Sequence, residues 1–410
     1  MLGYFRTSAV PFLGAVFTGV VVGPFSTYLI RDDVRLRGQP PYIFLVLAFF
    51  VIAIALWFVY RGKPTSSRTA QWVLATAGLL WVGNVAIASI HGDRFNHTVW
   101  LMPIFLLMLA IKAPSWTDLR TAVVLMAYLL AAMLTTAYLV EALGLLDPLY
   151  LPQGITQFQQ SQYWLPLDGL PGIEGRWTGP LGHNTRAGLA AAFIFVVGVA
   201  RWAPHAIPLI AIGGFFLLAT SVRASYLSAL AGLGIVILFS QRSFLGRIPV
   251  LVKWLVIVVI TVGAGIGFAL TGAGLTGRDT TIWPAFVELI PTSPWVGIGA
   301  SGIQQAGGTA AISGDAHNLF LDQLVRYGAV GLLVLLVFGA VITITNFRAA
   351  NRGFTMPAGI LTVYLIASQT DIQNDWLSFS YQSIIVIAGA LLAAQWLDSE
   401  GRLEETVNKP

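Results

Sequence analysis

The sequence predicts an all-α, polytopic integral membrane protein with about twelve transmembrane helices. Three observations support this fold class. Hydrophobic residues make up 56% of the 410 residues, whereas charged residues make up only 10%. A soluble protein of this size has about a quarter charged residues. The apolar residues also fall into runs that approach the roughly 20 residues a helix needs to cross the hydrocarbon core of a membrane.

The first apolar run, at about residues 8–30, shows no small-residue cleavage site, so we expect a retained first span and not a signal peptide. The boundaries are least certain where the runs are short, at 98–112, 186–200 and 204–220. In chain order, the expected spans are 8–30, 42–60, 69–90, 98–112, 121–144, 186–200, 204–220, 224–240, 249–270, 319–346, 355–370 and 379–397.

Two connections between these spans are long, at 145–185 and 271–316. An even number of spans places both on the same side of the membrane. We expect the whole chain, 1–410, to form a single transmembrane domain. Short helices are expected in the larger loop, which lies between the ninth and tenth spans, and residues 398–410 are expected to form a polar tail.

The distribution of charge predicts the orientation. If the N-terminus is cytoplasmic, 14 of the 23 basic residues, including all four lysines, lie on the inner side with 5 of the 18 carboxylates. The inner side then has a formal charge of +9 and the outer side −4, which make up the total of +5. Basic residues concentrate on the cytoplasmic side of membrane proteins. We therefore expect both termini and the tail in the cytoplasm, and both long loops outside.

Composition also excludes several kinds of site. The chain has no cysteine, which rules out disulfides, thiolate zinc sites and iron–sulfur clusters. The basic residues are spread by membrane side and form no patch, so no nucleic acid partner is predicted. The lipid bilayer itself is the expected surrounding.

The nine remaining arginines lie on the outer side, where no lysine is found. Arg176, Arg223 and Arg278 are each flanked by glycine or serine near an outer helix end. A guanidinium group is a planar fork of donors that fits phosphate oxygens and keeps its charge. Three such groups would suit a diphosphate at the head of a lipid carrier; structural ion pairs or lipid headgroup contacts are the alternative. A solvated charge cluster is expected at Arg31, Arg35 and Arg37.

His317 is the most distinctive single residue. It follows Ser313-Gly314-Asp315-Ala316 and precedes a long apolar run. We expect Asp315 or Ser313 to cap the following helix, which would place His317 in its first turn. The positive end of the helix dipole disfavours an imidazolium there, and a neutral imidazole is a suitable general base near ambient pH. A hydrogen-bonding role at the membrane surface is the alternative.

The other histidines give weaker signals. His183 and Asn184 lie in Gly182-His183-Asn184-Thr185, a pattern typical of a tight turn, just before the sixth span. A supporting role in binding and a structural role are both open for this pair. His91 and His97 share a short outer loop, and nothing else in the sequence supports a function for them.

Four tryptophans fall at predicted outer ends: Trp177, Trp283, Trp295 and Trp376. An interfacial aromatic belt explains them without further function, and stacking on sugar rings is the alternative. A metal site would have to combine His317 with Asp315, or Asp371 with Asp375. Neither pair has the ligand spacing of a known metal site, so no metal or other cofactor is predicted.

Three stretches resemble the O-antigen ligase and O-antigen polymerase family of bacterial membrane glycosyltransferases. The first is Gly175-Arg176-Trp177-Thr178-Gly179-Pro180 with Gly182-His183-Asn184. The second is Ser221-Val222-Arg223-Ala224. The most specific third stretch comprises Gly277-Arg278-Asp279 through Trp283, Pro294-Trp295-Val296-Gly297-Ile298-Gly299 and His317-Asn318-Leu319-Phe320-Leu321. Together with the twelve-span pattern, they cover most of the chain from Gly175 to Tyr327.

The resemblance implies transfer of a glycan from undecaprenyl diphosphate to a sugar hydroxyl, without a nucleotide sugar or an essential metal. The acceptor is lipid A core for a ligase and a second lipid-linked glycan for a polymerase. The reaction takes place on the outer face of the bacterial cytoplasmic (inner) membrane, and the loop 271–316 forms part of the active site. The resemblance implies that Arg223 and Arg278 hold the diphosphate and that His317 activates the acceptor hydroxyl. Substrate-binding roles would fall to Arg176, His183, Asn184, Asp279, Trp283 and Asn318.

The residues themselves agree with this chemistry. Fixed guanidinium groups at the edge of the lipid can stabilise a departing diphosphate in place of a metal ion. A covalent glycosyl-enzyme would need two closely spaced carboxylates, and the sequence identifies no such pair, so direct displacement with inversion is expected. A polymerase with the same chemistry remains open. A transporter or flippase of lipid-linked glycans is less consistent, because such proteins place charges or broken helices at mid-membrane.

Overall fold

The computed structural model describes residues 7–29, 40–64, 67–93, 97–146, 167, 170–171, 177–181, 183–201, 203–241, 248–253, 255, 281–369 and 380–407. These residues form helices and the turns between them. One isolated antiparallel bridge, between Lys63 and Ala113, is the exception within this part of the chain. The all-α fold class predicted from the sequence is confirmed for the described residues.

Long helices coincide with the predicted spans. They are α2 (Val10–Leu29), α3 (Pro40–Val59), α4 (Arg68–Ile90), α5 (Leu101–Ile111), α6 (Trp116–Ala142), α8 (Asn184–Arg201), α9 (Ile207–Thr220), α10 (Arg223–Phe239), α15 (Leu319–Asn351), α16 (Met356–Ser368) and α17 (Tyr381–Val407). The expected span at 249–270 falls mostly outside the described residues. The predicted tail at 398–410 is helical as far as Val407, because α17 continues through it.

Short helices occupy the connections. They are the 3-10 helices η2 (His97–Trp100), η3 (Gly179–Leu181), η4 (Pro204–Ala206) and η7 (Ile290–Thr292), and the α-helices α12 (Trp283–Val287), α13 (Gly299–Ala306) and α14 (Gly308–Ser313). Four of them, α12, η7, α13 and α14, lie in the predicted loop 271–316.

Among the described residues, 4 helices are long and apolar enough to cross a membrane: α4, α6, α15 and the Tyr381–Glu400 part of α17. Shorter apolar helices occur at Val10–Val21, Phe44–Val59, Leu101–Ile111, Pro204–Thr220, Arg223–Phe239 and Met356–Ser368. These helices are consistent with a membrane-embedded protein. The number of twelve spans remains a prediction from the sequence.

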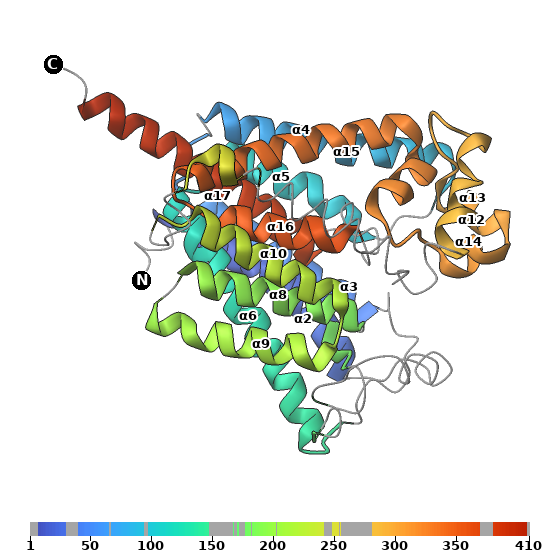
Figure 1. The fold of residues 1–410 in the computed structure, drawn as a ribbon, viewed down its shortest axis with the longest axis horizontal. Coiled ribbons are helices and arrows are strands. Elements are labelled where there is room, and N and C mark those ends of the chain that lie inside the picture. The colour runs from blue at the N-terminus through green and yellow to red at the C-terminus, as the bar shows by residue number, and fades with distance from the viewer. Residues whose placement is uncertain are drawn as a thin grey trace.

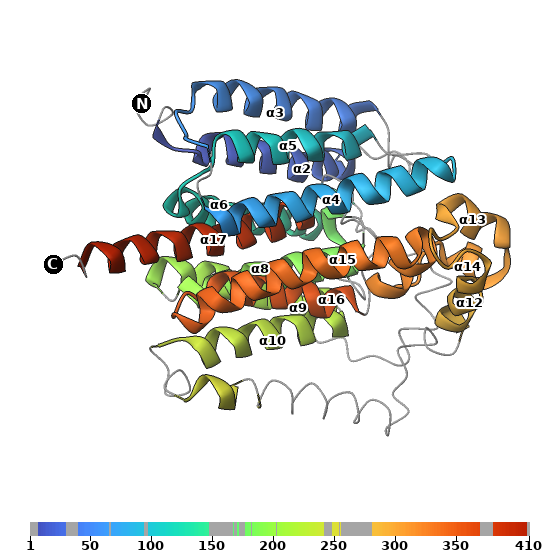
Figure 2. The same ribbon diagram turned by 90° about the horizontal axis from the view of Figure 1, so that it is seen from above.

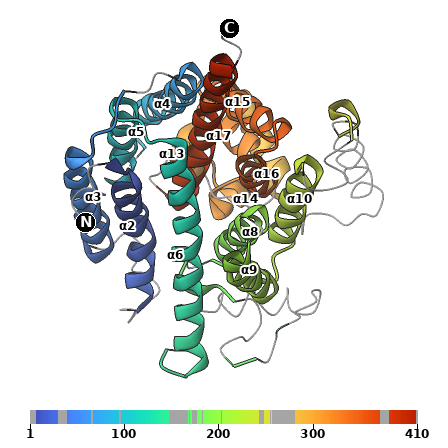
Figure 3. The ribbon, with the colours of Figure 1, turned by 90° about the vertical axis from the view of Figure 1, so that its left-hand side faces the viewer.

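The long helices pack side by side in a bundle (Figures 1 and 2). Both chain ends lie at one end of the bundle, and α12, α13 and α14 cover the opposite end. In the view along the bundle, α2 and α3 lie on one side, α8, α9 and α10 on the other, and α6 between them (Figure 3). The loop that bears α12, α13 and α14 is therefore separated from the chain ends by the length of the bundle.

The core centres on α8, which packs against α6, α9, α10 and α16. Its inner positions are small, and Ala190, Ala191 and Ala192 are fully buried. The neighbouring α9 approaches so closely that a Cβ on Gly213 would lie 2.7 Å from the backbone nitrogen of Phe195. Small residues at helix contacts are typical of membrane bundles, where close backbone approach provides the packing energy.

The helix α15 is broken at Gly328, whose φ of 65° and ψ of −169° are not helical. A buried backbone group without a partner is costly. Three backbone groups of α15 beside the break bond to the segment 294–298. The N–H of Ile298 donates to the carbonyl of Val325 at 2.9 Å. The N–H of Ala329 donates to the carbonyl of Pro294 at 2.8 Å, and that of Val330 donates to the carbonyl of Trp295 at 3.1 Å.

This contact, which we call the Gly297–Gly328 joint, requires glycine on both sides. A Cβ on Gly328 would lie 2.2 Å from the carbonyl carbon of Trp295, and one on Gly297 would lie 2.3 Å from that of Arg326. Both glycines also have positive φ, at 65° and 68°. The Pro-Trp-Val-Gly-Ile-Gly motif is thus a structural joint that fixes the first turns of α15.

Candidate active site

His317 lies in the loop between α14 and α15, and Asp315 contacts it twice. Asp315 Oδ1 accepts the backbone N–H of His317 at 2.9 Å. The same oxygen lies 3.1 Å from His317 Nδ1, and the two side chains are 13% and 22% exposed. Burial raises the pKa of Asp315 above its usual value, while His317 opposes this shift by favouring the carboxylate. The imidazole and the carboxylate therefore form a pair that is mostly shielded from solvent.

The N-cap residue of α15 differs from the predicted one. Neither Asp315 nor Ser313 is the N-cap: Asn318 is, and its Oδ1 accepts the N–H groups of Phe320 and Leu321, both at 3.1 Å. His317 thus lies just before the helix and not in its first turn, with a positive φ of 49°. The prediction of the cap was wrong, although His317 still lies beside the positive end of the helix.

The loop before His317 is anchored by α15 itself. Asp322 Oδ1 accepts the N–H of Ala316 at 3.2 Å, and its Oδ2 forms an ion pair with Arg326 Nε at 2.9 Å. Arg326 also donates to the carbonyl of Gly314. From the other side, Trp283 Nε1 donates to the carbonyl of Ala316 at 3.0 Å. The backbone around His317 is therefore held from both α12 and α15.

The cap formed by α12, α13 and α14 is attached to the end of α4. Asp93 accepts the N–H groups of Ala300 and Ser301, at 2.7 and 2.8 Å, at the start of α13. His91 Nε2 lies at hydrogen-bonding distance, 3.1 Å, from the carbonyl of Val296. Sequence analysis found no function for His91. The structure gives it and Asp93 a part in holding the cap.

His183 and Asn184 form the turn that starts α8. The N–H of Thr185 donates to His183 Nδ1 at 3.3 Å and to Asn184 Oδ1 at 3.0 Å. Asn184 is buried, whereas His183 is half-buried. Both side chains therefore contribute to capping α8. The predicted substrate-binding role of the pair remains a prediction.

Trp177 is a core residue. It is 3% exposed, it stacks on Phe216 with ring centroids 4.7 Å apart, and its Nε1 donates to Glu141 Oε2 at 2.5 Å. A Cβ on Gly179 would lie 2.6 Å from the Trp177 ring, which explains the glycine in this motif. Both interpretations of Trp177, as part of an interfacial belt or as a sugar-stacking residue, are wrong. Trp295, by contrast, is 71% exposed.

The Ser-Val-Arg motif is the tight turn between α9 and α10. Ser221 ends α9 in a left-handed conformation with φ of 48°, and its hydroxyl donates to the carbonyl of Leu218 at 2.8 Å. Arg223 begins α10 and is exposed. Among the described residues, Ser221 and His317 are the only non-glycine residues with positive φ. Strained backbone of this kind is concentrated at functional sites.

Hydrogen bonds and close contacts connect the helix ends that bear these residues. Asn318 Nδ2 donates to the carbonyl of Gln369, at the end of α16, at 3.3 Å. Tyr381 Oη, at the start of α17, donates to the carbonyl of Arg186, in the first turn of α8, at 2.9 Å. A Cβ on Gly188 in α8 would lie 2.4 Å from Ser225 Oγ, in the first turn of α10. The starts of α8, α10, α15 and α17 thus surround the end of α16, which packs against all four helices.

The structure therefore places His183, Asn184, Arg223, His317 and Asn318 at one end of the bundle, on helices that share α16 as a neighbour. Other predicted residues, namely Arg176, Arg278, Asp279, Trp376, Asp371 and Asp375, lie outside the described residues, as does the charge cluster at Arg31, Arg35 and Arg37. Within the described part of the chain, no group of three or more histidine, aspartate or glutamate side chains is arranged to hold a metal ion.

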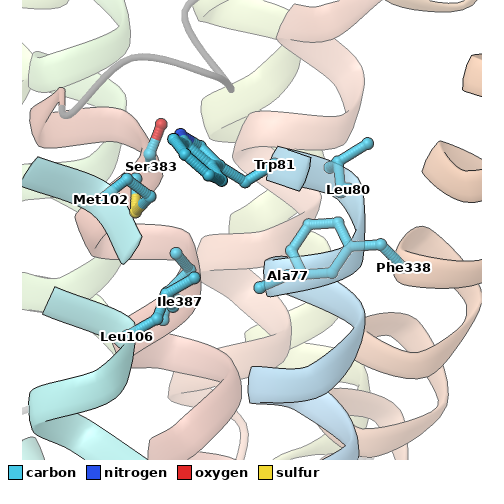
Figure 4. Close-up of a pocket in the computed structure, with 8 residues that line it drawn as sticks. All are labelled: Ala77, Leu80, Trp81, Met102, Leu106, Phe338, Ser383 and Ile387. Atoms are coloured by element: carbon cyan, nitrogen blue, oxygen red, sulfur yellow. The ribbon is translucent and has the colours of Figure 1, made fainter. Parts of the chain in front are cut away.

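A pocket elsewhere in the bundle involves none of these residues. It is lined mostly by apolar side chains of α4, α5, α15 and α17. Trp81 and the polar Ser383 lie towards one end, and Leu106 and Ile387 lie towards the other (Figure 4). Its lining offers no charged group to a diphosphate or a sugar. The candidate active site is therefore the cluster of helix ends and not this pocket.

Comparison with known proteins supports the choice of site. Residues 208–336 match the family model described as O-antigen ligase. This stretch is less than half of the chain, but it includes Arg223, Arg278 and His317. It also spans the joint at Gly297 and Gly328. No curated protein matches the chain. The resemblance to the O-antigen ligase family stated from the motifs is confirmed.

Proposed function

Because residues 208–336 match the O-antigen ligase family, we propose that this chain is a membrane glycosyltransferase of the ligase type. It transfers a glycan from undecaprenyl diphosphate to a sugar hydroxyl such as that of lipid A core, on the outer face of the bacterial cytoplasmic membrane. The observation that supports this most strongly is that the matched stretch contains Arg223, Arg278 and His317, the three residues to which the chemistry is assigned.

In the proposed reaction, His317 Nε2 takes the proton of the acceptor hydroxyl while its oxygen forms a bond to the anomeric carbon. The bond between that carbon and the diphosphate oxygen breaks, and the electron pair leaves with undecaprenyl diphosphate. The proton on His317 then passes to water. A positioned general base contributes about 10²–10⁴ to the rate of such a step.

Arg223 and Arg278 bind the diphosphate in this proposal. Arg223 is exposed at the start of α10, where the positive end of the helix dipole adds positive potential. Guanidinium groups stabilise the negative charge that develops on the leaving diphosphate, and one such donor is worth about 10²–10³ in rate. No metal ion has a role in this scheme.

The described residues contain two carboxylates close to His317, which bears on stereochemistry. Asp322 is buried, paired with Arg326 and bonded to the N–H of Ala316, so it is committed to the loop. Asp315 is committed to His317. Neither carboxylate is left to attack an anomeric carbon, as a retaining mechanism would require. The arrangement supports direct displacement with inversion.

The experiment is to incubate the purified protein with undecaprenyl-diphosphate glycan and lipid A core, and to separate the products by size. Addition of one glycan block supports a ligase, and a ladder supports a polymerase of the same chemistry. The activity is expected to persist in EDTA. Absence of any transfer, or turnover that is lost in EDTA and restored by Mg²⁺, would contradict the proposal.

A transporter or flippase is the alternative of another class, and the break in α15 bears on it. Broken helices in transporters present free backbone groups to a substrate. Here three backbone groups beside Gly328 are bonded to the segment 294–298. The break therefore supports a fixed joint in preference to a transport site.

A further inference from the structure

We infer that Asp315 is the positioning residue for His317: its carboxylate holds the imidazole in the tautomer that has its proton on Nδ1, so that Nε2 is the base. This inference rests on the proposed function, because it takes His317 as the group that receives the acceptor proton. Nothing in the family match assigns a role to Asp315.

One oxygen of Asp315 lies beside both the backbone and the ring of His317. Asp315 Oδ1 accepts the backbone N–H of His317 at 2.9 Å and lies 3.1 Å from the ring Nδ1. The first contact stabilises a backbone φ of 49°, which is uncommon for a residue with a side chain. The second places the negative charge of the carboxylate beside Nδ1, which favours a proton on that nitrogen.

The carboxylate is itself part of a fixed loop. Ser313 Oγ donates to the backbone carbonyl of Asp315 at 2.7 Å. On the other side, Ala316 is bonded through its N–H to Asp322 and through its carbonyl to Trp283. The backbone that carries the Asp315 side chain is therefore fixed by contacts to both α12 and α15.

The charges around the pair are few. From α15, the pair faces Asp322 and Arg326, which are paired with each other. The sequences of α13 and α14 contain no titratable residue, and α16 contributes Tyr364 alone. Asp93, at the end of α4, is bonded to the start of α13, and Glu288, at the end of α12, is exposed. Arg326 is therefore the described cation nearest the pair, and it is bonded to Asp322.

A neutral imidazole has one N–H and one bare nitrogen, and the partner of the N–H decides which is which. With Nδ1–H beside the carboxylate of Asp315, Nε2 is bare and can take a proton. The carboxylate then lies beside the imidazolium that forms and stabilises it, as the aspartate does in the serine protease triad.

The first test is the transfer assay with Asp315→Asn. We expect kcat to fall by about 10²–10⁴-fold with the donor KM unchanged, since the residue does not touch the diphosphate. Asp315→Glu, which keeps the charge, should recover part of the rate.

Glu288→Gln is the matched control, because it makes the equivalent change at an exposed carboxylate of the same cap and should keep the wild-type rate. Folding of each variant is checked by its melting temperature. An Asp315→Asn protein that is folded and has a wild-type rate, or a reduced rate that Asp315→Glu does not recover in part, would overturn the inference.

The second test does not depend on activity. The wild-type protein is labelled with ¹⁵N-histidine in bilayers, and the His317 signal is identified by its loss in His317→Gln. A protonated Nδ1 and a bare Nε2 are expected, and a protonated Nε2 would overturn the inference. Full transfer activity in His317→Ala would instead contradict the proposed function, so the two failures are distinguishable.

Discussion

At the scale of residues, His317 is held in a conformation that side chains rarely adopt. Its φ is 49°, Asp315 Oδ1 accepts its backbone N–H and lies 3.1 Å from its ring Nδ1, and the side chain remains 22% exposed. A residue that served only packing would not need a strained backbone with an accessible ring. Strain at a residue beside a helix start is typical of groups that must be presented to a substrate.

Removal of the imidazole tests this role. We expect His317→Ala to lose transfer by about 10²–10⁴-fold while the protein still inserts and binds the donor, because only the proton acceptor is lost. The measurement is product formation by purified protein, with donor binding followed separately. His205→Ala is the matched control: His205 is exposed in η4, between α8 and α9, and should be dispensable. Equal activity of the two variants would contradict a general-base role.

The arginines are tested by a change that keeps the charge. Arg223→Lys and Arg278→Lys each replace a planar fork of donors by a single ammonium. We expect kcat/KM to fall by about 10–100-fold, because a charge-assisted hydrogen bond contributes about 1.5–3 kcal/mol. Steady-state kinetics with the lipid-linked donor measure this. If lysine at both positions supports the wild-type rate, the diphosphate is not held by these two residues.

The sequence predicted which residues to consider better than it predicted their contacts. Ser313, Asp315 and Asn318 are all good N-cap types within six positions, so only the backbone could show that Asn318 is the cap. Trp177 was placed at an interface because tryptophan is enriched there. Its partner Glu141 lies 36 positions earlier in the chain, and no local pattern indicates that pairing. The i,i+4 spacing of Asp322 and Arg326 could have indicated their ion pair.

At the scale of elements, the Gly297–Gly328 joint determines where the start of α15 lies. The segment 294–298 bonds to three backbone groups of α15 beside Gly328. His317 is only two residues before α15, and the cap helices are bonded to the same turns. Displacement of the joint should therefore displace the base as well.

Adding a methyl group at Gly297, by substitution with alanine, tests the joint. Gly297→Ala would place a Cβ 2.3 Å from a backbone carbon of Arg326, at a residue with φ of 68°. We expect a lower melting temperature, from a strain on the order of 1–3 kcal/mol, together with a lower rate of transfer. Gly339→Ala is the matched control, because Gly339 lies in α15 and nothing lies within 4 Å of its added Cβ. A Gly297→Ala protein as stable and active as Gly339→Ala would contradict the account of the joint.

The helices were predictable and the break was not. Hydropathy located α2 to α6 and α15 to α17 because a spanning helix must be apolar along its length. A glycine within such a helix is common and gives no sign of a break. The break at Gly328 depends on hydrogen bonds to a segment about thirty residues earlier, which no period of three or four residues can indicate.

At the scale of the whole molecule, the two ends of the bundle differ in content. One end holds both termini, and the other holds the cap helices (Figure 2). The predicted inner side has a formal charge of +9 and the predicted outer side −4, and the outer side has arginines but no lysine. An orientation with the cap outside follows from the positive-inside rule. A site there would meet the headgroup of a lipid-linked donor at the membrane surface.

The most direct measurement is a cryo-electron microscopy structure of the full chain in a lipid nanodisc with undecaprenyl-diphosphate glycan bound. The account predicts density for the diphosphate at the guanidinium groups of Arg223 and Arg278, with His317 Nε2 facing the anomeric carbon. A diphosphate bound away from Arg223 and Arg278, or an imidazole remote from the sugar, would contradict it.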